Sequence, residues 1–158
     1  MAYILAADIG KWREYHEYLE SVRARMPEVA HEFATASWHY DTADSRCLHD
    51  SWVDSLLIRE PAQGDRHEVR SLEIEVRLLG PLHNGRMTLI YLDVHSYSFN
   101  GPFGSPPQDT GHGDWLCDEV RLSESDHVLH EVEFSSGSRW IIECRDITWL
   151  WEPFEPRA

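Results

Sequence analysis

Alternating apolar and polar positions in the last third of the chain predict three consecutive antiparallel strands. The expected strands cover residues 116–122, 128–134 and 140–151. Because successive side chains of a strand point to opposite faces, one face of each strand is expected to pack against the core and the other to be exposed to solvent. In the third strand the apolar parity changes between Cys144 and Ile147, which predicts a β-bulge there.

The middle of the chain shows the same period of two. Residues 48–58 begin the predicted β region, and residues 72–78 alternate most regularly between aliphatic and charged side chains. Residues 87–96 are apolar on both faces and are expected to form a central strand. Between these last two strands, Asn84 and Gly85 predict a hairpin with a type I′ turn, because both central positions of that turn need a positive φ.

A period of three to four residues marks the N-terminal part. Between residues 9 and 25 the apolar side chains form one stripe of an amphipathic helix, and Asp8 is its expected N-cap. Pro27 suits the first turn of a second helix. Residues 37–46 are polar and irregular, as in a linker.

These elements predict an α+β fold in a single domain that covers 1–158. An N-terminal helical hairpin at 8–36 is followed by an antiparallel β meander of about six strands at 48–151. We expect the meander to curl into a half barrel or a sandwich against the helices.

The net charge of the chain limits the kinds of molecule that it is expected to bind. The chain carries 28 Asp and Glu side chains against 14 Lys and Arg, a formal net charge of -14. Such a field repels nucleic-acid phosphates and anionic membranes and favours encounter with a basic protein. We therefore expect no nucleic acid and no membrane among its partners.

The cysteines and the N-terminus predict a cytoplasmic protein. Cys47, Cys117 and Cys144 are odd in number and lack C-x-x-C spacing, which is typical of reduced thiols. The first eight residues lack the basic start and apolar core of a signal peptide. No dinucleotide-binding glycine motif or P-loop is present, and we expect no cofactor.

Four segments carry a resemblance to other proteins. They are LHDSWVDSLLI at 48–58, LEIEVRLLGPLHNG at 72–85, HGDWLCDEVRLSES at 112–125 and HEVEFSSGSRWIIECRDI at 130–147. Together with the helical opening, they resemble an uncharacterised family of small bacterial proteins, which is loosely similar to the immunity proteins of toxin systems. The resemblance implies the fold and a bacterial origin, and it brings no established active residues.

Register arithmetic identifies one candidate catalytic group. If the turns between the last three strands are short, Asp118 faces His130 and His130 faces Cys144. That row has the acid, base and nucleophile of a cysteine hydrolase. The alternative interpretation is a buried, hydrogen-bonded Asp and His beside a core cysteine.

Two further groups are candidates for metal and protein binding. His49, Asp50, His112 and Asp114 come from loops or strand ends and are a weak alternative for a metal site. At the C-terminus, aromatic and acidic side chains alternate in a way that suits a protein interface. The residues of that second group are Trp149, Trp151, Glu152 and Glu155.

Charge and the lack of a catalytic motif favour a binding function. The leading hypothesis is an immunity-like or inhibitor-like acidic module that neutralises a basic protein partner, such as a toxin. The alternative is a small hydrolase or metal-dependent enzyme that uses the Asp/His/Cys or the His/Asp group. A module that assembles with itself is a third hypothesis.

Overall fold

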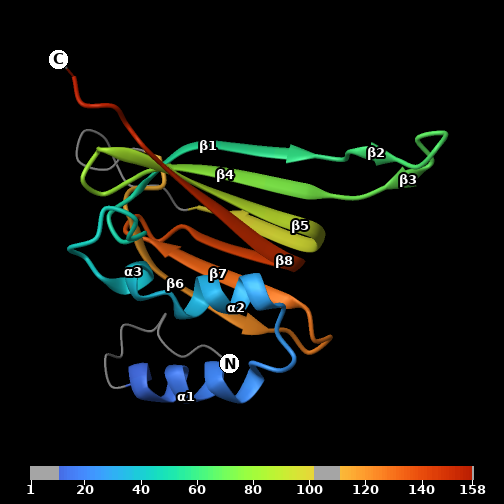
Figure 1. Cartoon of the computed structure of the whole chain (residues 1–158), viewed down its shortest axis with the longest axis horizontal. Helices are drawn as coiled ribbons and strands as arrows, with labels where there is room; N and C mark the ends of the chain where they lie inside the picture. Colours follow the sequence, from blue (N-terminus) through green and yellow to red (C-terminus); the bar gives the residue numbers. More distant parts are fainter. Residues whose placement is uncertain (1–10, 102–110, 158) are drawn as a thin grey trace.

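The structure, a computed structural model, describes residues 11–101 and 111–157. Helices α1 (Trp12–Val22), α2 (Glu28–Thr35) and α3 (Ser37–Tyr40) come first, and strands follow (Figure 1). The strands are β1 (Trp52–Arg59), β2 (Ala62–Gln63), β3 (Val69–Arg70), β4 (Glu73–Leu79), β5 (Gly85–Asn100), β6 (Trp115–Leu122), β7 (Val128–Phe134) and β8 (Arg139–Pro153). The predicted α+β class is confirmed. No described helix combines the length and the apolar character needed to cross a bilayer.

The helices follow the predicted apolar stripe, with different bounds. In α1 the side chains of Tyr15, Leu19 and Val22 are buried, as the spacing predicts. Lys11 stands at the N-cap position, and the predicted cap, Asp8, lies outside the described residues. Pro27 precedes the first turn of α2, which confirms the predicted second helix.

The prediction of an irregular linker at 37–46 is wrong for residues 37–40. Ser37–Tyr40 forms the short helix α3, which buries Trp38 and His39. The pattern could not show this, because a four-residue helix is too short to reveal a period. Its stability comes from packing, since isolated helices of this length are unstable in water.

Six antiparallel strands form one open sheet in the order β1-β4-β5-β8-β7-β6, which is not closed into a barrel. The predicted single meander is replaced by two, β1-β4-β5 and β6-β7-β8, which are joined because β5 pairs with β8. β5 and β8 are the two longest strands and pair along almost their whole length, so this pairing brings the apolar side chains of both strands together. The predicted central position of β5 is confirmed. The short pair β2 and β3 extends β1 and β4 beyond the body (Figure 1).

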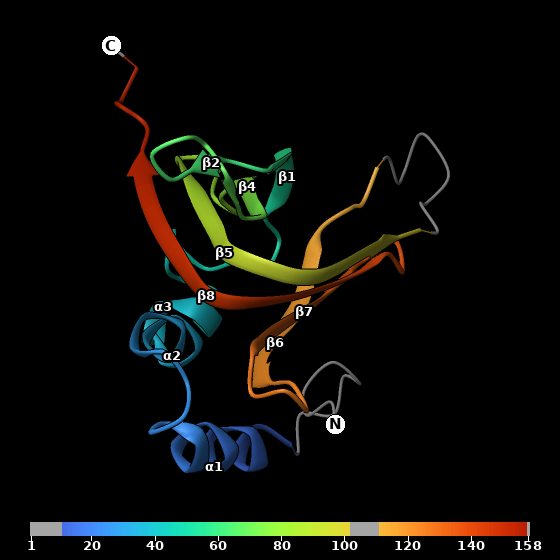
Figure 2. The same cartoon turned by 90° about the vertical axis from the view of Figure 1, so that its right-hand side faces the viewer.

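β5 and β8 bend together through the middle of the sheet (Figure 2). The predicted change of parity in β8 is real, because Cys144 and Ile147 are both fully buried. The register shift, however, falls between Val94 and Ser96 of β5, so the extra residue, His95, belongs to β5 and not to β8.

The hairpin between β4 and β5 forms where it was predicted, with a different turn. The turn covers residues 80–84, and its positive φ, 55°, belongs to His83 and not to Asn84 or Gly85. Gly85 is instead the first residue of β5, where an added Cβ would collide with the ring of Trp151. Glycine is therefore needed here for close packing, and the type I′ prediction is wrong.

The helices and the inner face of the sheet enclose one hydrophobic core. α2 packs on β8 and β6, and α1 lies beyond α2 against β6 (Figure 2). The largest fully buried side chains are aromatic and come from both layers, namely Tyr15, Phe33, Tyr91, Trp115, Phe134 and Trp140. The polar site described next lies inside this aromatic core.

Candidate functional site

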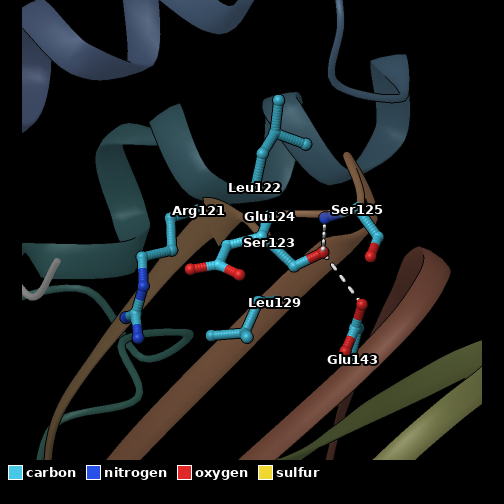
Figure 3. A pocket seen from close by; sticks show the side chains of 7 residues that line it. All are labelled: Arg121, Leu122, Ser123, Glu124, Ser125, Leu129 and Glu143. Carbon is cyan, nitrogen blue, oxygen red and sulfur yellow. Dashed lines mark hydrogen bonds between the residues drawn. The ribbon is translucent and has the colours of Figure 1, made fainter.

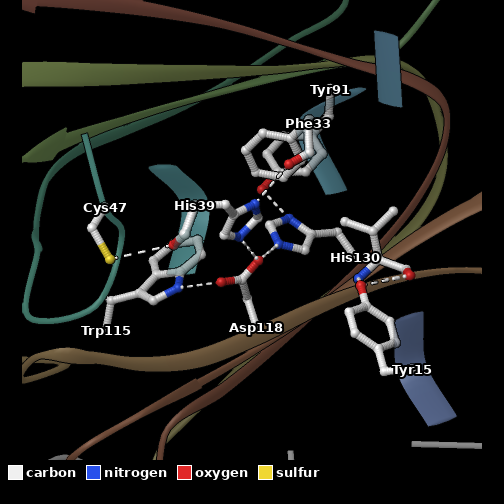
Figure 4. A network of polar contacts seen from close by, with 9 residues as sticks. Tyr15, Phe33, His39, Cys47, Tyr91, Trp115, Asp118 and His130 are labelled. Atoms are coloured by element: carbon white, nitrogen blue, oxygen red, sulfur yellow. Dashed lines mark hydrogen bonds and ion pairs between the residues drawn. The ribbon is translucent and has the colours of Figure 1, made fainter. Parts of the chain in front are cut away.

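A buried carboxylate, Asp118 of β6, joins three other side chains (Figure 4). Its Oδ2 lies 2.7 Å from Nε2 of His39 in α3 and 2.8 Å from Nε2 of His130 in β7. Its Oδ1 accepts a hydrogen bond of 3.0 Å from the indole nitrogen of Trp115. Asp118 is 2% exposed, and its three partners are buried as well. One polar point in the core therefore ties a helix to two strands.

The neighbours of each ring nitrogen assign the protons of the two histidines. Nδ1 of His39 lies 2.8 Å from the carbonyl oxygen of Phe33, so both of its nitrogens face acceptors, and only the doubly protonated ring can donate to both. Nδ1 of His130 lies 2.8 Å from the Tyr91 hydroxyl, which can donate, so one hydrogen on Nε2 satisfies that ring. Burial by itself would raise the pKa of Asp118, but the charge of His39 and the hydrogen bonds from both histidines hold it well below its usual range.

The predicted row of Asp118, His130 and Cys144 is only partly formed. Val132, not His130, lies directly opposite Asp118, and Val128, not His130, lies opposite Cys144. Both registers differ by two residues because the turns close at other positions than predicted. The alternation of inward and outward side chains was predicted correctly, so Asp118 and His130 both point to the inner face. Their hydrogen bond runs diagonally between the two strands. Both ring nitrogens of His130 already have partners, so His130 is not available as a base for the thiol.

Cys144 is expected to be chemically inert in the folded protein. Burial raises the pKa of its thiol to about 12, and Sγ donates to the carbonyl oxygen of Asp146 at 3.4 Å. Because the thiolate is the nucleophile, we expect Ellman's reagent at neutral pH to leave Cys144 unmodified until the protein is unfolded in guanidinium. Rapid reaction of the native protein that disappears in Cys144→Ala would contradict this. The thiol that the cysteine-hydrolase hypothesis needs is therefore buried, and burial disfavours its thiolate form.

Two residues of the predicted metal site, His112 and Asp114, bond to side chains outside the group, whereas His49 lies beside Asp50. Nδ1 of His49 lies 3.1 Å from Oδ1 of Asp50, and Nδ1 of His112 faces a serine hydroxyl at 3.1 Å. Oδ1 of Asp114 accepts a hydrogen bond of 2.9 Å from the indole of Trp52. Among the described residues, no three His, Cys, Asp or Glu side chains are grouped as metal ligands.

The predicted C-terminal binding group separates into two parts. Trp149 and Trp151 are partly buried against the hydrophobic core, and the Trp149 ring lies 4.8 Å from that of Trp38 in α3. Their main contribution is packing. Glu152 and Glu155 are exposed and remain available to a partner.

A shallow hollow of about 370 Å³ lies at the turn between β6 and β7 (Figure 3). In its lining the hydroxyl of Ser123 donates to Oε1 of Glu143 at 2.8 Å, and Nδ1 of His127, which is not a lining residue, lies 3.0 Å from the same oxygen. The hydrogen bond from Ser123 is the main reason that the pKa of Glu143 is lowered. In a hydrolytic triad the imidazole lies between hydroxyl and carboxylate. Here the carboxylate lies between the other two, so Ser123 is not activated.

The β6 edge of the sheet is capped by tyrosine hydroxyls from α1. The hydroxyl of Tyr15 donates to the carbonyl oxygen of Val120 at 3.0 Å and accepts from its N–H at 2.8 Å. The hydroxyl of Tyr18 accepts from the N–H of Leu122 at 2.8 Å. These backbone groups of β6 are therefore not free to pair with another strand.

The β1 edge is open beyond its first residues. In the described part of the chain, β1 pairs only with β4. Its side chains Trp52, Leu56, Leu57 and Ile58 are exposed, as is Val69 in the neighbouring β3. Proteins usually cover such an edge or place charges on it. An uncovered apolar edge is therefore a candidate protein interface.

Two features of these sites could not be read from the pattern. His39 lies in a segment without periodicity, and no signal in its neighbours predicts its bond to Asp118, 79 residues away in sequence. The apolar residues Leu56, Leu57 and Ile58 lie in a segment predicted to be a strand, but the sequence does not say whether that strand has a neighbour on both sides.

Comparisons with protein-family models, with curated proteins and with solved structures find no match for this chain. Its function has to be argued from its own residues.

Proposed function

We propose that this chain is an immunity-like or inhibitor-like module that neutralises a basic protein partner. The observation that carries the proposal is how the charges are distributed. Twelve of the sixteen ion pairs of the described residues use arginine, so much of the limited positive charge is already neutralised within the chain. The carboxylates left over supply most of the field that a partner would meet.

Exposed carboxylates that form no ion pair within the described residues occur on both layers. They are Glu14, Glu17, Glu20, Glu28, Glu32, Asp41, Asp65, Glu68, Glu124, Glu152 and Glu155. Surface charges of one sign steer a partner of the other sign and raise the association rate, whereas apolar contact supplies most of the affinity. The exposed apolar side chains of β1 provide such contact.

A pull-down with the immobilised chain from a lysate of its own cells tests the proposal. We expect one basic protein to be retained at low salt and released as salt screens the charges. Calorimetry on the purified pair is expected to show Kd rising about tenfold or more between roughly 50 and 300 mM salt. An acidic partner, or a Kd insensitive to salt, would contradict the proposal.

Two charge-reversed variants provide matched controls. Glu152→Lys with Glu155→Lys changes the net charge as much as Glu28→Lys with Glu32→Lys does. Glu152 lies on the same row across the sheet as the start of β1, whereas Glu28 and Glu32 lie on α2. We expect the C-terminal variant to weaken binding more. Equal effects would mean that only overall charge matters.

A further inference from the structure

We propose that the β1 edge binds an extended segment of the basic partner, which adds to the sheet as a seventh strand. This inference rests on the proposed function for the identity of the occupant, and it adds the place and the mode of binding. In strand addition the backbone hydrogen bonds supply affinity, and alternate side chains supply specificity.

The two edges of the sheet differ in a way that favours this mode. Tyr15 and Tyr18 occupy backbone groups of Val120 and Leu122 at the end of β6, so a further strand cannot pair with that part of the edge. Beside β1 the described residues provide such a bond only just before the strand, where the N–H of Trp115 donates to the carbonyl oxygen of Ser51. From there to Arg59 the outward backbone groups face away from the sheet.

Apolar side chains line both faces of the open run. Leu57 is 48% exposed on the outer face, and Leu56 and Ile58 are each 38% exposed on the inner face. A strand laid beside β1 would cover part of all three, whereas a globular surface resting on one face would reach only one side. The register shift at Asp54 marks where the regular run begins.

The charges along β1 favour a basic occupant. Arg59 is already held by Glu73 at 2.9 Å and Glu75 at 2.8 Å. Asp54 and Glu60, at the two ends of the run, are paired only at the surface, at 3.3 Å and 3.7 Å. Surface pairs of this kind contribute little and are readily exchanged. A segment with alternating apolar and basic residues therefore matches both the apolar centre and the acidic ends.

A second copy of the chain fits the edge less well. Antiparallel self-pairing centred on Leu57 would place Asp54 of one copy opposite Glu60 of the other, and like charges placed opposite each other are destabilising. Pairing centred on Leu56 would place Asp54 opposite Ile58. Two copies would also each bring a net charge of -14.

Amide hydrogen exchange with model peptides tests the site directly. The probes are a seven-residue peptide of alternating Val and Lys and its counterpart of alternating Val and Glu. We expect the Val/Lys peptide to slow exchange of the outward β1 amides by about tenfold or more at saturation, and the Val/Glu peptide to leave them unchanged. Slowed exchange elsewhere with unchanged β1 amides would overturn the proposal.

A charge at the centre of the edge provides the mutational test. Leu57→Lys is expected to weaken binding of the Val/Lys peptide and of the captured partner at least tenfold. Leu150→Lys is the matched control, because Leu150 is 53% exposed on β8, which is not an edge strand, and it is expected to bind as the wild type does. Equal loss in both variants would overturn the proposal.

The outcomes separate this inference from the proposed function. If the partner still binds Leu57→Lys with unchanged affinity, the edge proposal fails and the proposed function stands. If no basic partner exists, the proposed function fails, and the peptide exchange still decides whether the edge accepts a strand. A dimer in sedimentation that dissociates in Leu57→Lys would overturn the proposed occupant in favour of a second copy.

Discussion

Replacing Asp118 with alanine is expected to lower the free energy of unfolding by about 3–5 kcal/mol, because it leaves a buried charge without its partner. The imidazolium of His39 would lose its counter-ion, and the donors of His130 and Trp115 would lose their acceptor. Urea denaturation followed by tryptophan fluorescence measures the change. If the free energy of unfolding fell by less than about 1 kcal/mol, the structure would not depend on Asp118 as the counter-ion of a buried charge.

Two controls isolate the buried charge. Asp126→Ala removes a carboxylate whose contact with Arg25 is a solvent-exposed pair at 3.4 Å, so we expect a cost of about 1 kcal/mol or less. In a His39→Leu background, Asp118→Ala is expected to cost less than in the wild type, because no imidazolium is then left unpaired. Additive losses would mean that His39 and Asp118 are not coupled.

The same ion pair sets the direction of the pH dependence. A carboxylate whose pKa is lowered by folding stabilises the protein fully above the pKa of the unfolded chain, about 3.9, and loses that contribution as the pH falls toward the folded value. For Asp118 the lowered pKa places this loss on the acid side. The difference in unfolding free energy between the wild type and Asp118→Asn should therefore shrink below about pH 4.

Replacing Tyr15 with phenylalanine is expected to lower the free energy of unfolding by about 1–3 kcal/mol, because it removes one hydroxyl that satisfies two backbone groups. Val120 is fully buried, so water cannot replace the hydroxyl without opening the edge. We expect the Val120 amide to exchange at least tenfold faster in Tyr15→Phe. Sedimentation should also show more self-association, because a second edge becomes available.

Tyr97→Phe is the matched control for this substitution. Tyr97 lies on β5 and is 45% exposed, so its hydroxyl can be replaced by water and little change in stability is expected. If Tyr15→Phe were as stable as Tyr97→Phe, with unchanged exchange at Val120, the hydroxyl would not be the cap of the β6 edge.

Local periodicity determined the elements and their faces. The spacing in α1 and the alternation in β4, β7 and β8 follow from bond geometry within a few residues, so the sequence alone predicts which side chains turn inward. For this reason the inner faces of Asp118 and His130 were predicted correctly even though their register was not. Composition likewise determined the net charge, on which the proposed partner depends.

Contacts between distant residues were decided only by the tertiary structure. The bond from His39 to Asp118 spans 79 residues and the cap from Tyr15 to Val120 spans 105, and no local pattern encodes either. The pairing of β5 with β8 is of the same kind, because the choice between neighbours depends on the total surface that each arrangement buries. That choice left β1 at the edge of the sheet, and with it the surface proposed for the partner.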